Sequence, residues 1–465
     1  MREGSRNVHP YIPNSVPKVK REMLEAVGAG SETDLFEDIP EALRLGRPLD
    51  LPDPLVSEVD LKRHVEEILD KNRTCRELLS FLGAGCYRHH VPAVCDEVNQ
   101  RSEFLTAYAG EPYDDHGRFQ ALFEYASMMG DLLDMDVVNV PTYDGLQAAA
   151  TAVRMAARIT GRPEVLVGGA IDPALRSKLV DYGGAGLDVR GVAVAPATGQ
   201  LDRAALEDAL SASTAAVFFQ NPGFLGQLET HGAEIAAIGH EHGALCVVGV
   251  DPISLGILAP PVDYGADIVC GDVQGLGMHM QFGGGQAGFI ATRDEPCYVM
   301  EYPSRLFGIA PTAVDGEYGF GDVAYERTSF AERVEGKEFV GTASALWGIT
   351  AGVYLAAMGP QGMAELGEGI MLRARYLMSK LDGLPGVRAP IFDAPHFKEF
   401  VVNFDGTGRP VRDVSEALLR EGILLGTDLS DAFPDLGQSA LLCVTEVHTR
   451  ADLDRLVEAL RRAVS

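Results

Sequence analysis

The sequence lacks several features that would assign it to a familiar class. Its seven cysteines are scattered and include no Cys-x-x-Cys pair, so neither a disulfide framework nor a zinc site is indicated. No apolar stretch has the length of a signal peptide or a membrane span, and we therefore expect a cytoplasmic protein. Basic residues are few, 39 against 67 acidic ones, which gives a net charge of −28. Such a balance repels phosphate backbones and anionic lipids, so we expect neither nucleic acid nor a membrane as a partner.

The length and the hydrophobic content predict more than one domain. With 465 residues, 46% of them hydrophobic, the chain can form two lobes and an extension. Residues 1–75 are punctuated by prolines and show helical spacing at 20–27 and 58–71, which predicts a helical N-terminal arm. Arms of this kind often wrap a partner subunit. We expect a large α/β domain over 76–330 and a smaller α+β domain over 331–465.

Helices alternate with short apolar strands along the central part of the chain. The predicted strands lie at 164–167, 215–219, 245–250, 267–270 and 288–292, and the predicted helices at 117–135, 145–160, 205–210 and 229–242. This alternation indicates a mostly parallel sheet that is covered on both faces. In the last third, helices are predicted at 343–358, 361–384, 414–421 and 449–464, and strands at 399–404 and 441–445.

Asp251 directly follows one of the apolar strands. Open α/β sheets bind ligands at the carboxyl ends of their strands. A carboxylate in this place is what a pyridoxal-phosphate site uses against the pyridinium nitrogen, because it keeps the ring able to accept electrons. The alternative interpretation is an aspartate that caps the following turn.

The lysine that such a site requires is missing. The stretch that should carry it, residues 271–285, contains no lysine, and there is none between Asp251 and Lys337. Without an amine no Schiff base forms, so we expect no covalent cofactor in this chain and no primary amine poised in the cleft. The glycines at 283–285 predict a tight turn, with a phosphate cradle as the alternative. Asp144 is predicted to cap the helix that follows it and not to face a phosphate.

Histidines offer weaker candidates. Neighbouring residues of a strand point to opposite faces, so His89 and His90 are interpreted as interface or packing residues and not as a metal pair. His116 follows Asp114 and Asp115 in a predicted loop. This triplet lacks a recognised ligand spacing, and no metal site is predicted.

Several blocks of sequence, taken in order, resemble a known family. They include Tyr11-Ile12-Pro13, Leu35-Phe36-Glu37-Asp38-Ile39-Pro40, Ser80-Phe81-Leu82-Gly83-Ala84-Gly85, Gly249-Val250-Asp251-Pro252-Ile253-Ser254-Leu255-Gly256, Tyr264-Gly265-Ala266-Asp267-Ile268-Val269 and Cys443-Val444-Thr445-Glu446. Nearly end to end, the chain is similar to subunit 1, the alpha-like chain, of the two-subunit glycine dehydrogenase (decarboxylating), the P-protein of the glycine cleavage system.

The resemblance implies a fold, a cofactor and partners. The implied fold is that of the aspartate aminotransferase superfamily, fold type I, in a heterotetramer. The beta-like partner, a subunit 2-like homologue, carries the lysine for pyridoxal phosphate, and this lysine-less chain completes the assembly. Glycine or a related amino acid is decarboxylated, and its aminomethyl group passes to the lipoyl group of an H-protein-like carrier. Gln274 falls near the place of the missing lysine, and His116, Asp251 and Gln274 are the catalytic candidates.

Three segments depart from the family pattern near the region that binds substrate and cofactor. Tyr87-Arg88-His89-His90 stands for the usual Tyr-Asp-His-Tyr, and Phe339-Val340-Gly341-Thr342-Ala343 for Asn-Ile-Cys-Thr-Asn. The stretch after Tyr108 is one residue shorter than usual. The cleft candidates are therefore Tyr87, His89, His90, Tyr108, Asp114, Asp115 and Thr342.

Two other functions are compatible with the residues. The chain is then either a non-catalytic scaffold or regulatory pseudoenzyme, or a stand-alone enzyme without pyridoxal phosphate. In the second case Asp114, Asp115, His116 and Asp251 carry the chemistry.

Overall fold

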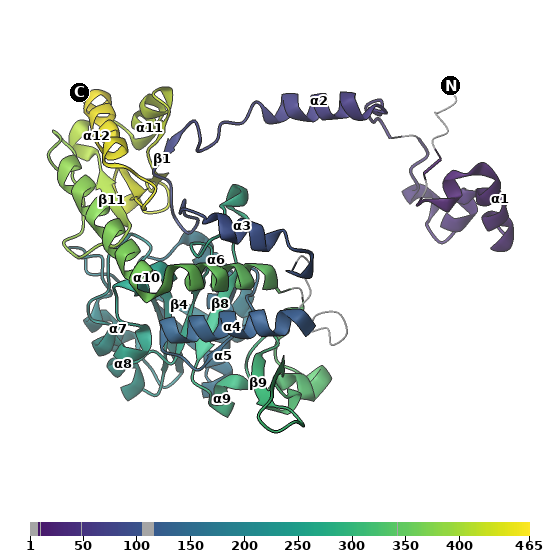
Figure 1. The fold of residues 1–465 in the computed structure, drawn as a ribbon. Coiled ribbons are helices and arrows are strands. Elements are labelled where there is room, and N and C mark those ends of the chain that lie inside the picture. The colour runs from purple at the N-terminus through teal and green to yellow at the C-terminus, as the bar shows by residue number, and fades with distance from the viewer. Residues whose placement is uncertain (1–7, 10, 48, 105–115, 342) are drawn as a thin grey trace. The chain divides into compact units, whose positions relative to one another are not determined.

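The computed structural model describes residues 8–9, 11–47, 49–104, 116–341 and 343–465, in two compact units that divide after Asn72. The first unit contains α1 (Pro17–Ala26) and α2 (Glu58–Leu69), which confirm the two helices predicted for the arm (Figure 1). None of its described side chains is buried. This unit therefore has no core of its own in the part that the structure describes.

A seven-stranded sheet organises the second unit. Its strands are β2 (Val137–Val138), β3 (Glu164–Gly168), β4 (Asp188–Val192), β5 (Thr214–Gln220), β6 (Leu245–Val250), β7 (Ile268–Asp272) and β8 (Gly288–Thr292). They lie in the order β2-β8-β7-β6-β5-β3-β4. The strands β4, β3, β5, β6 and β7 are parallel to one another. β8 is antiparallel to both of its neighbours, β7 and β2. The mostly parallel sheet predicted from the sequence is confirmed.

Helices cover both faces of this sheet because its strands are apolar on both sides. In β5, Val217 and Phe219 join one core, and Ala216 and Phe218 join the other. The first core is shared with α4 (His116–Leu133), α7 (Arg203–Ala209), α8 (Gly232–Glu241) and α10 (Ala345–Leu381). The second is shared with α5 (Gly145–Thr160), α6 (Pro173–Gly183) and α9 (Pro296–Val299). Figure 1 shows α4 and α10 together in one of these layers.

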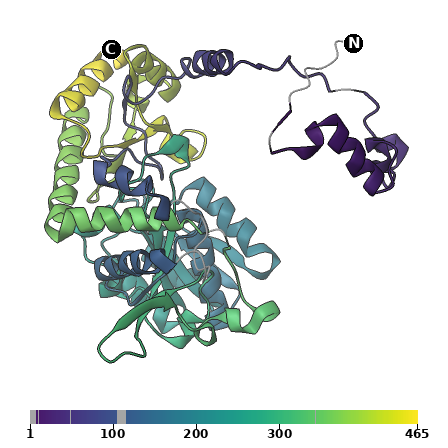
Figure 2. The same ribbon diagram turned by 45° about the vertical axis from the view of Figure 1, so that its right-hand side comes forward.

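The long helix α10 connects the large sheet to the C-terminal part of the chain. It bends where Gly359 has a φ of 61° and is followed by Pro360, as Figure 2 shows. The sequence predicted two helices separated at this point. Before the bend, Tyr354 lies in the core of the large sheet, and well after it Leu377 lies in a second core.

The C-terminal part forms a small lobe around an antiparallel sheet. Its strands β11 (Glu399–Asn403), β14 (Ser439–Cys443) and β13 (Thr427–Asp428) are covered by α11 (Val411–Arg420) and α12 (Arg450–Val464). β1 (Leu79–Ser80) adds to this lobe by pairing with β12 (Ile423–Leu424). The boundary near residue 330 stays a prediction.

Some elements were not predicted. They are β4, α3 (Ala93–Asn99), α6, α9, the short strands β1, β2, β12 and β13, and the hairpin of β9 (Phe307–Pro311) and β10 (Tyr318–Asp322). β4 lies at the edge of the sheet with most of its residues exposed, and the hairpin strands are mostly exposed or half-buried, so neither has the apolar pattern of a core strand. No helix in the described ranges is long and apolar enough to cross a membrane.

The loop after β5 brings the small lobe to the large sheet. The Leu228 N–H donates to Pro395 O at 2.8 Å, and the Phe397 N–H donates to Gly226 O at 3.4 Å. Gly226 has a φ of 91°, and a Cβ at this position would overlap the backbone carbonyl of Glu399. A glycine is therefore required for the segment before β11 to approach the ends of β5 and β6.

We predict that Gly226→Ala loosens this contact between the lobes. The control is Gly161→Ala, because Gly161 also has a positive φ, 67°, but faces open space. Both variants carry the strain of a left-handed alanine, and only the first adds a backbone clash. The free energy of unfolding should fall by about 1–3 kcal/mol more in Gly226→Ala than in the control. Equal urea midpoints for the two variants would contradict the tight approach.

Candidate functional site

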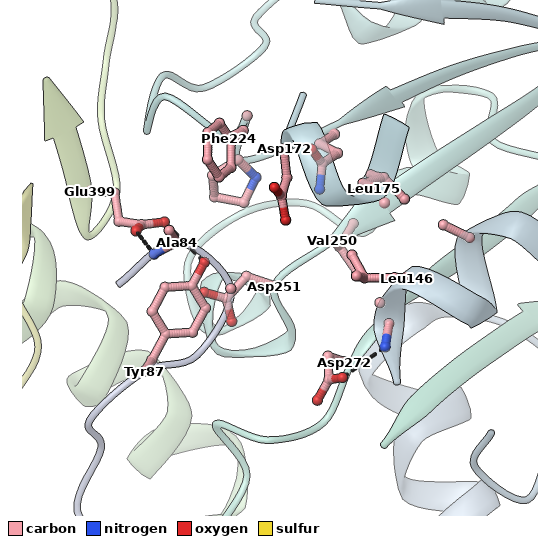
Figure 3. A pocket seen from close by; sticks show the side chains of 18 of the residues that line it. Ala84, Tyr87, Leu146, Asp172, Leu175, Phe224, Val250, Asp251, Asp272 and Glu399 are labelled. Carbon is pink, nitrogen blue, oxygen red and sulfur yellow. Dashed lines mark hydrogen bonds between the residues drawn. The ribbon is translucent and has the colours of Figure 1, made fainter. Parts of the chain in front are cut away.

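A cleft of about 280 Å³ opens at the carboxyl ends of β5, β6 and β7, where β11 and the segment after β1 approach them (Figure 3). Four carboxylates line it, from Asp172, Asp251, Asp272 and Glu399. Among the described lining residues, Lys398 is the one cation. The cleft is therefore acidic, and it lies where an open α/β sheet is expected to bind its ligand.

Asp251 lies in this cleft at the end of β6, as the sequence predicted, and it also caps the next turn. Its Oδ1 accepts a hydrogen bond from the Ile253 N–H at 3.1 Å. Its Oδ2 lies 2.5 Å from the Nζ of Lys398. One oxygen of this carboxylate thus caps the turn, while the other takes part in the cleft.

Lys398 corrects the expectation of a cleft without a primary amine. Its side chain is 3% exposed and comes from the segment before β11, in the small lobe. Nζ lies 3.3 Å from the ring centroid of Tyr87 and 3.3 Å from Nε2 of His89. An ammonium over an aromatic face and against a carboxylate is favoured on both sides. The search for a lysine near β7 missed it because it arrives from a distant part of the chain.

Tyr87 and Glu399 form a second buried pair. The Tyr87 hydroxyl donates to Oε2 of Glu399 at 2.9 Å, and the Ala84 N–H donates to Oε1 at 2.7 Å (Figure 3). Burial raises the pKa of Glu399 to about 7, although these hydrogen bonds and Lys398 act in the opposite direction. Burial likewise raises the pKa of Tyr87 well above its usual value. Tyr87 was a predicted cleft residue, whereas Glu399 was not.

Gln274 follows β7 in the place where a lysine was sought. Its Oε1 accepts from the Tyr87 N–H at 2.9 Å, and its Nε2 donates to Tyr87 O at 2.9 Å and to Met278 O at 3.0 Å. These bonds use the side-chain amide to hold the segment that carries Tyr87. The catalytic role predicted for Gln274 stays a prediction.

Two carboxylates occupy the N-terminus of α5. Asp144 caps the helix by accepting from the Gln147 N–H at 2.7 Å, as predicted. Asp272 accepts from the Gly145 N–H at 2.8 Å, as well as from the N–H groups of Gln274 and Ala287. Burial raises the pKa of Asp272 to about 7 in spite of these three bonds. Two of the amides at this helix start, those of Gly145 and Gln147, are thus engaged by the protein itself.

His89 and His90 have different surroundings. His89 is buried, with Nδ1 at 2.8 Å from Oε2 of Glu446, while His90 is exposed and uses its backbone N–H on the other oxygen at 2.5 Å. Burial of Glu446 acts to raise its pKa, but these bonds lower it to about 2. His89 therefore lies between the carboxylate of Glu446 at Nδ1 and the amine of Lys398, 3.3 Å from Nε2.

The other candidates fall partly outside the structure. Tyr108, Asp114, Asp115 and Thr342 lie outside the described residues, and His116 is the first residue of α4 with no described side chain. Their predicted roles stay predictions. Within the described ranges, no group of three or more His, Cys, Asp or Glu side chains is placed to hold a metal ion.

Sequence reasoning missed Lys398, Glu399, Asp272 and Glu446. One signal was present for the first two, since a charged pair directly precedes the apolar run at 400–402. Glu446 lies within a block used for the family resemblance. Asp272 closely follows a predicted strand, as Asp251 does, and the same argument about strand ends would have selected it.

We predict that Glu399→Gln changes the dependence of stability on pH. The folded pKa is about 7 and the unfolded value is near 4.3, so between them the folded protein holds a proton that the unfolded chain releases. The contribution of Glu399 to the free energy of unfolding therefore falls as the pH rises through this window, by about 1.4 kcal/mol per pH unit. Glutamine has no such loss.

The variant should gain stability relative to the natural protein when urea midpoints are compared from pH 5 to pH 8. Glu103→Gln, in an exposed turn, corrects for the general effect of removing a negative charge. A difference between variant and natural protein that stays constant over this range would contradict the burial of a titrating carboxyl.

Comparisons with known proteins agree with this architecture. The family described as "Glycine cleavage system P-protein" matches residues 9–460. A protein of Staphylothermus marinus named "Probable glycine dehydrogenase (decarboxylating) subunit 1" is 37% identical over 461 residues, which cover 97% of each chain. A protein of the same name from Carboxydothermus hydrogenoformans is 39% identical over 453 residues, covering 97% of this chain and 99% of that one.

Solved structures give the fold. The crystal structure of glycine decarboxylase (P-protein) of the glycine cleavage system, in inhibitor-bound form, superposes with a TM-score of 0.84 at 34% identity, covering 98% of this chain and 100% of that one. A sphingosine-1-phosphate lyase of Burkholderia pseudomallei shares the fold, with a TM-score of 0.65 at 16% identity over 92% and 94% of the two chains. The predicted fold, that of the pyridoxal-phosphate-dependent enzymes of fold type I, is confirmed. The chain belongs to the glycine cleavage system P-protein family.

Proposed function

We propose that this chain is the subunit without the Schiff-base lysine in a glycine-decarboxylating enzyme whose pyridoxal phosphate is held by a partner chain that has this lysine. Full-length similarity to proteins named as subunit 1 supports the assignment to a two-chain enzyme. The observation that carries the division of labour is the end of β7, where Gln274 stands and no lysine follows before Lys337.

The residues around this strand end do not fit the cofactor. Pyridoxal phosphate supplies an electron sink, and it requires an amine for covalent attachment. Gln274 cannot form that bond, and its amide is engaged with Tyr87 and Met278. The substitution Gln274→Lys would therefore break three hydrogen bonds before offering an amine, and we expect no cofactor binding from it alone.

The place for a phosphate is also unsuitable. A helix N-terminus attracts phosphate through free amides and its dipole. At α5 the N–H groups of Gly145 and Gln147 already donate to the carboxylates of Asp272 and Asp144. A phosphate here would displace a protein carboxylate and face the other acids of the cleft.

The substrate and the carrier follow from the same assignment. We propose glycine or a related amino acid as substrate, and a lipoyl group on an H-protein-like carrier as acceptor of the aminomethyl group. In this scheme the described residues of the chain position its partner and keep its own acidic cleft free of the anionic cofactor. We propose that Asp251 and His116 take part in catalysis only within the assembled two-chain enzyme.

Co-expression tests the proposal. The full chain would be produced alone and together with a lysine-bearing relative from the same source, and each product would be measured by native mass spectrometry and visible absorbance. After free cofactor is removed by gel filtration, we expect the chain alone to retain no stoichiometric lysine-bound cofactor, and the complex to show its absorbance. With a lipoylated carrier, the complex should release carbon dioxide from glycine.

The alternatives give other results. A stable but inactive complex, even with a lipoylated carrier and related amino acids, would indicate a scaffold. Activity of the colourless chain alone would indicate a stand-alone enzyme without pyridoxal phosphate. Either result would overturn the proposed function.

We predict that the arm holds the partner through α2. Its Leu61, Val65 and Ile68 form an exposed apolar stripe at helical spacing, and the described arm buries none of its side chains. Ile68→Asp should weaken the complex at least tenfold, because it places a charge on this stripe. Arg63→Gln changes the net charge equally on the opposite face and serves as the control. Equal affinity of both variants in a pull-down titration would contradict the role of the stripe.

A further inference from the structure

The buried amine of Lys398 is held on three sides. Its Nζ contacts the carboxylate of Asp251 at 2.5 Å, the ring of Tyr87 at 3.3 Å from the centroid, and Nε2 of His89 at 3.3 Å. An ammonium is removed from water only where such partners compensate for its lost hydration. The side chain is therefore built into the cleft and does not hang into it from the surface.

Asp251 depends on this amine in turn. Its Oδ2 is buried and accepts no hydrogen bond of good geometry from the described residues. The ion pair with Lys398 is what neutralises it. Without the amine, this buried carboxylate oxygen would carry an uncompensated charge, which another cation would stabilise.

The amine competes with a cofactor ring for one position. In enzymes of this fold a carboxylate at this strand end faces the pyridinium nitrogen. Here the Lys398 ammonium already lies at Oδ2 of Asp251 and also covers the Tyr87 ring. A second cation at the same oxygen would meet both steric overlap and like-charge repulsion.

The same contacts join the two lobes. Asp251 ends β6 of the large sheet, whereas Lys398 precedes β11 of the small one. His89 extends the chain of contacts to Glu446, which follows β14. The Asp251–Lys398 ion pair thus joins the end of β6 to the start of β11, and the contacts of His89 extend it to Glu446.

We propose that Lys398 is a tethered cation that takes the place of a cofactor's ring nitrogen at Asp251, closes this cleft to pyridoxal phosphate and locks the small lobe onto the large sheet. The inference deepens the proposed function by giving a physical cause for a cofactor-free subunit. It rests on contacts within this chain and does not require that the partner be identified.

Ring binding tests the proposal on the full-length chain alone. The probe is pyridoxine, which has the pyridine ring but neither the aldehyde, which would react with any lysine, nor the phosphate, which the acidic cleft repels. Lys398→Met should bind pyridoxine at least tenfold more tightly than the natural chain in calorimetric titration. Lys337→Met, outside this cleft, is the matched control and should show no gain.

The double variant Lys398→Met with Asp251→Asn should lose the gain in pyridoxine affinity, because the carboxylate is what attracts the ring nitrogen. Equal binding by the natural chain and Lys398→Met, or a gain that survives Asp251→Asn, would overturn the proposal. Failure of these tests leaves the co-expression result unaffected, so the two conclusions fail separately.

Amine labelling tests the buried ion pair of Lys398 with Asp251 even if Lys398→Met does not fold. In the native chain treated with an acetylating reagent, Lys18 and Lys62 are exposed and should react, while Lys398 should be protected at least a hundredfold. Asp251→Asn should raise the rate at Lys398 at least tenfold without changing Lys62. Native labelling of Lys398 as fast as that of Lys62, measured by peptide mass spectrometry, would overturn the proposal.

Discussion

The burial of Lys398 against Asp251 is the interaction on which the account of this cleft depends. Two opposite charges removed from water are tolerated only if each is the other's partner. The approach of the segment before β11 to the loop after β5, which Gly226 permits, brings them together. The fold of a cofactor-dependent enzyme is kept, while a side chain of the protein fills the position that gives such a cleft its chemistry.

The other features of the cleft are consistent with this replacement. The side-chain amide of Gln274 is hydrogen-bonded to the backbone of Tyr87, and Asp272 accepts a hydrogen bond from the first amide of α5. The Asp251 carboxylate and the first amide of α5, which are placed to contact pyridoxal phosphate, are thus occupied by other groups of the same chain. This occupation of the cleft is what the proposed division of labour between two chains requires.

Local pattern was sufficient for the five inner strands of the large sheet, but not for its edge strands β2 and β4 or for the cleft. The helix at 145–160 and the strands at 245–250 and 288–292 were predicted with the bounds that the structure has, because their apolar spacing is set by the cores they enter. Asp251 was found because the end of a parallel strand is a local feature. Lys398 was missed because its place beside Asp251 arises from tertiary contacts between the lobes, which no spacing along the chain records. Tyr87 was found through the family resemblance and not through its own pattern.

A crystal structure of the assembled enzyme, from crystals grown with excess pyridoxal phosphate, tests the central claim most directly. The account predicts cofactor density in the lysine-bearing partner, and in this chain the Nζ of Lys398 within ion-pair distance of Asp251. Density for a pyridine ring against Asp251, with Lys398 turned away, would contradict it.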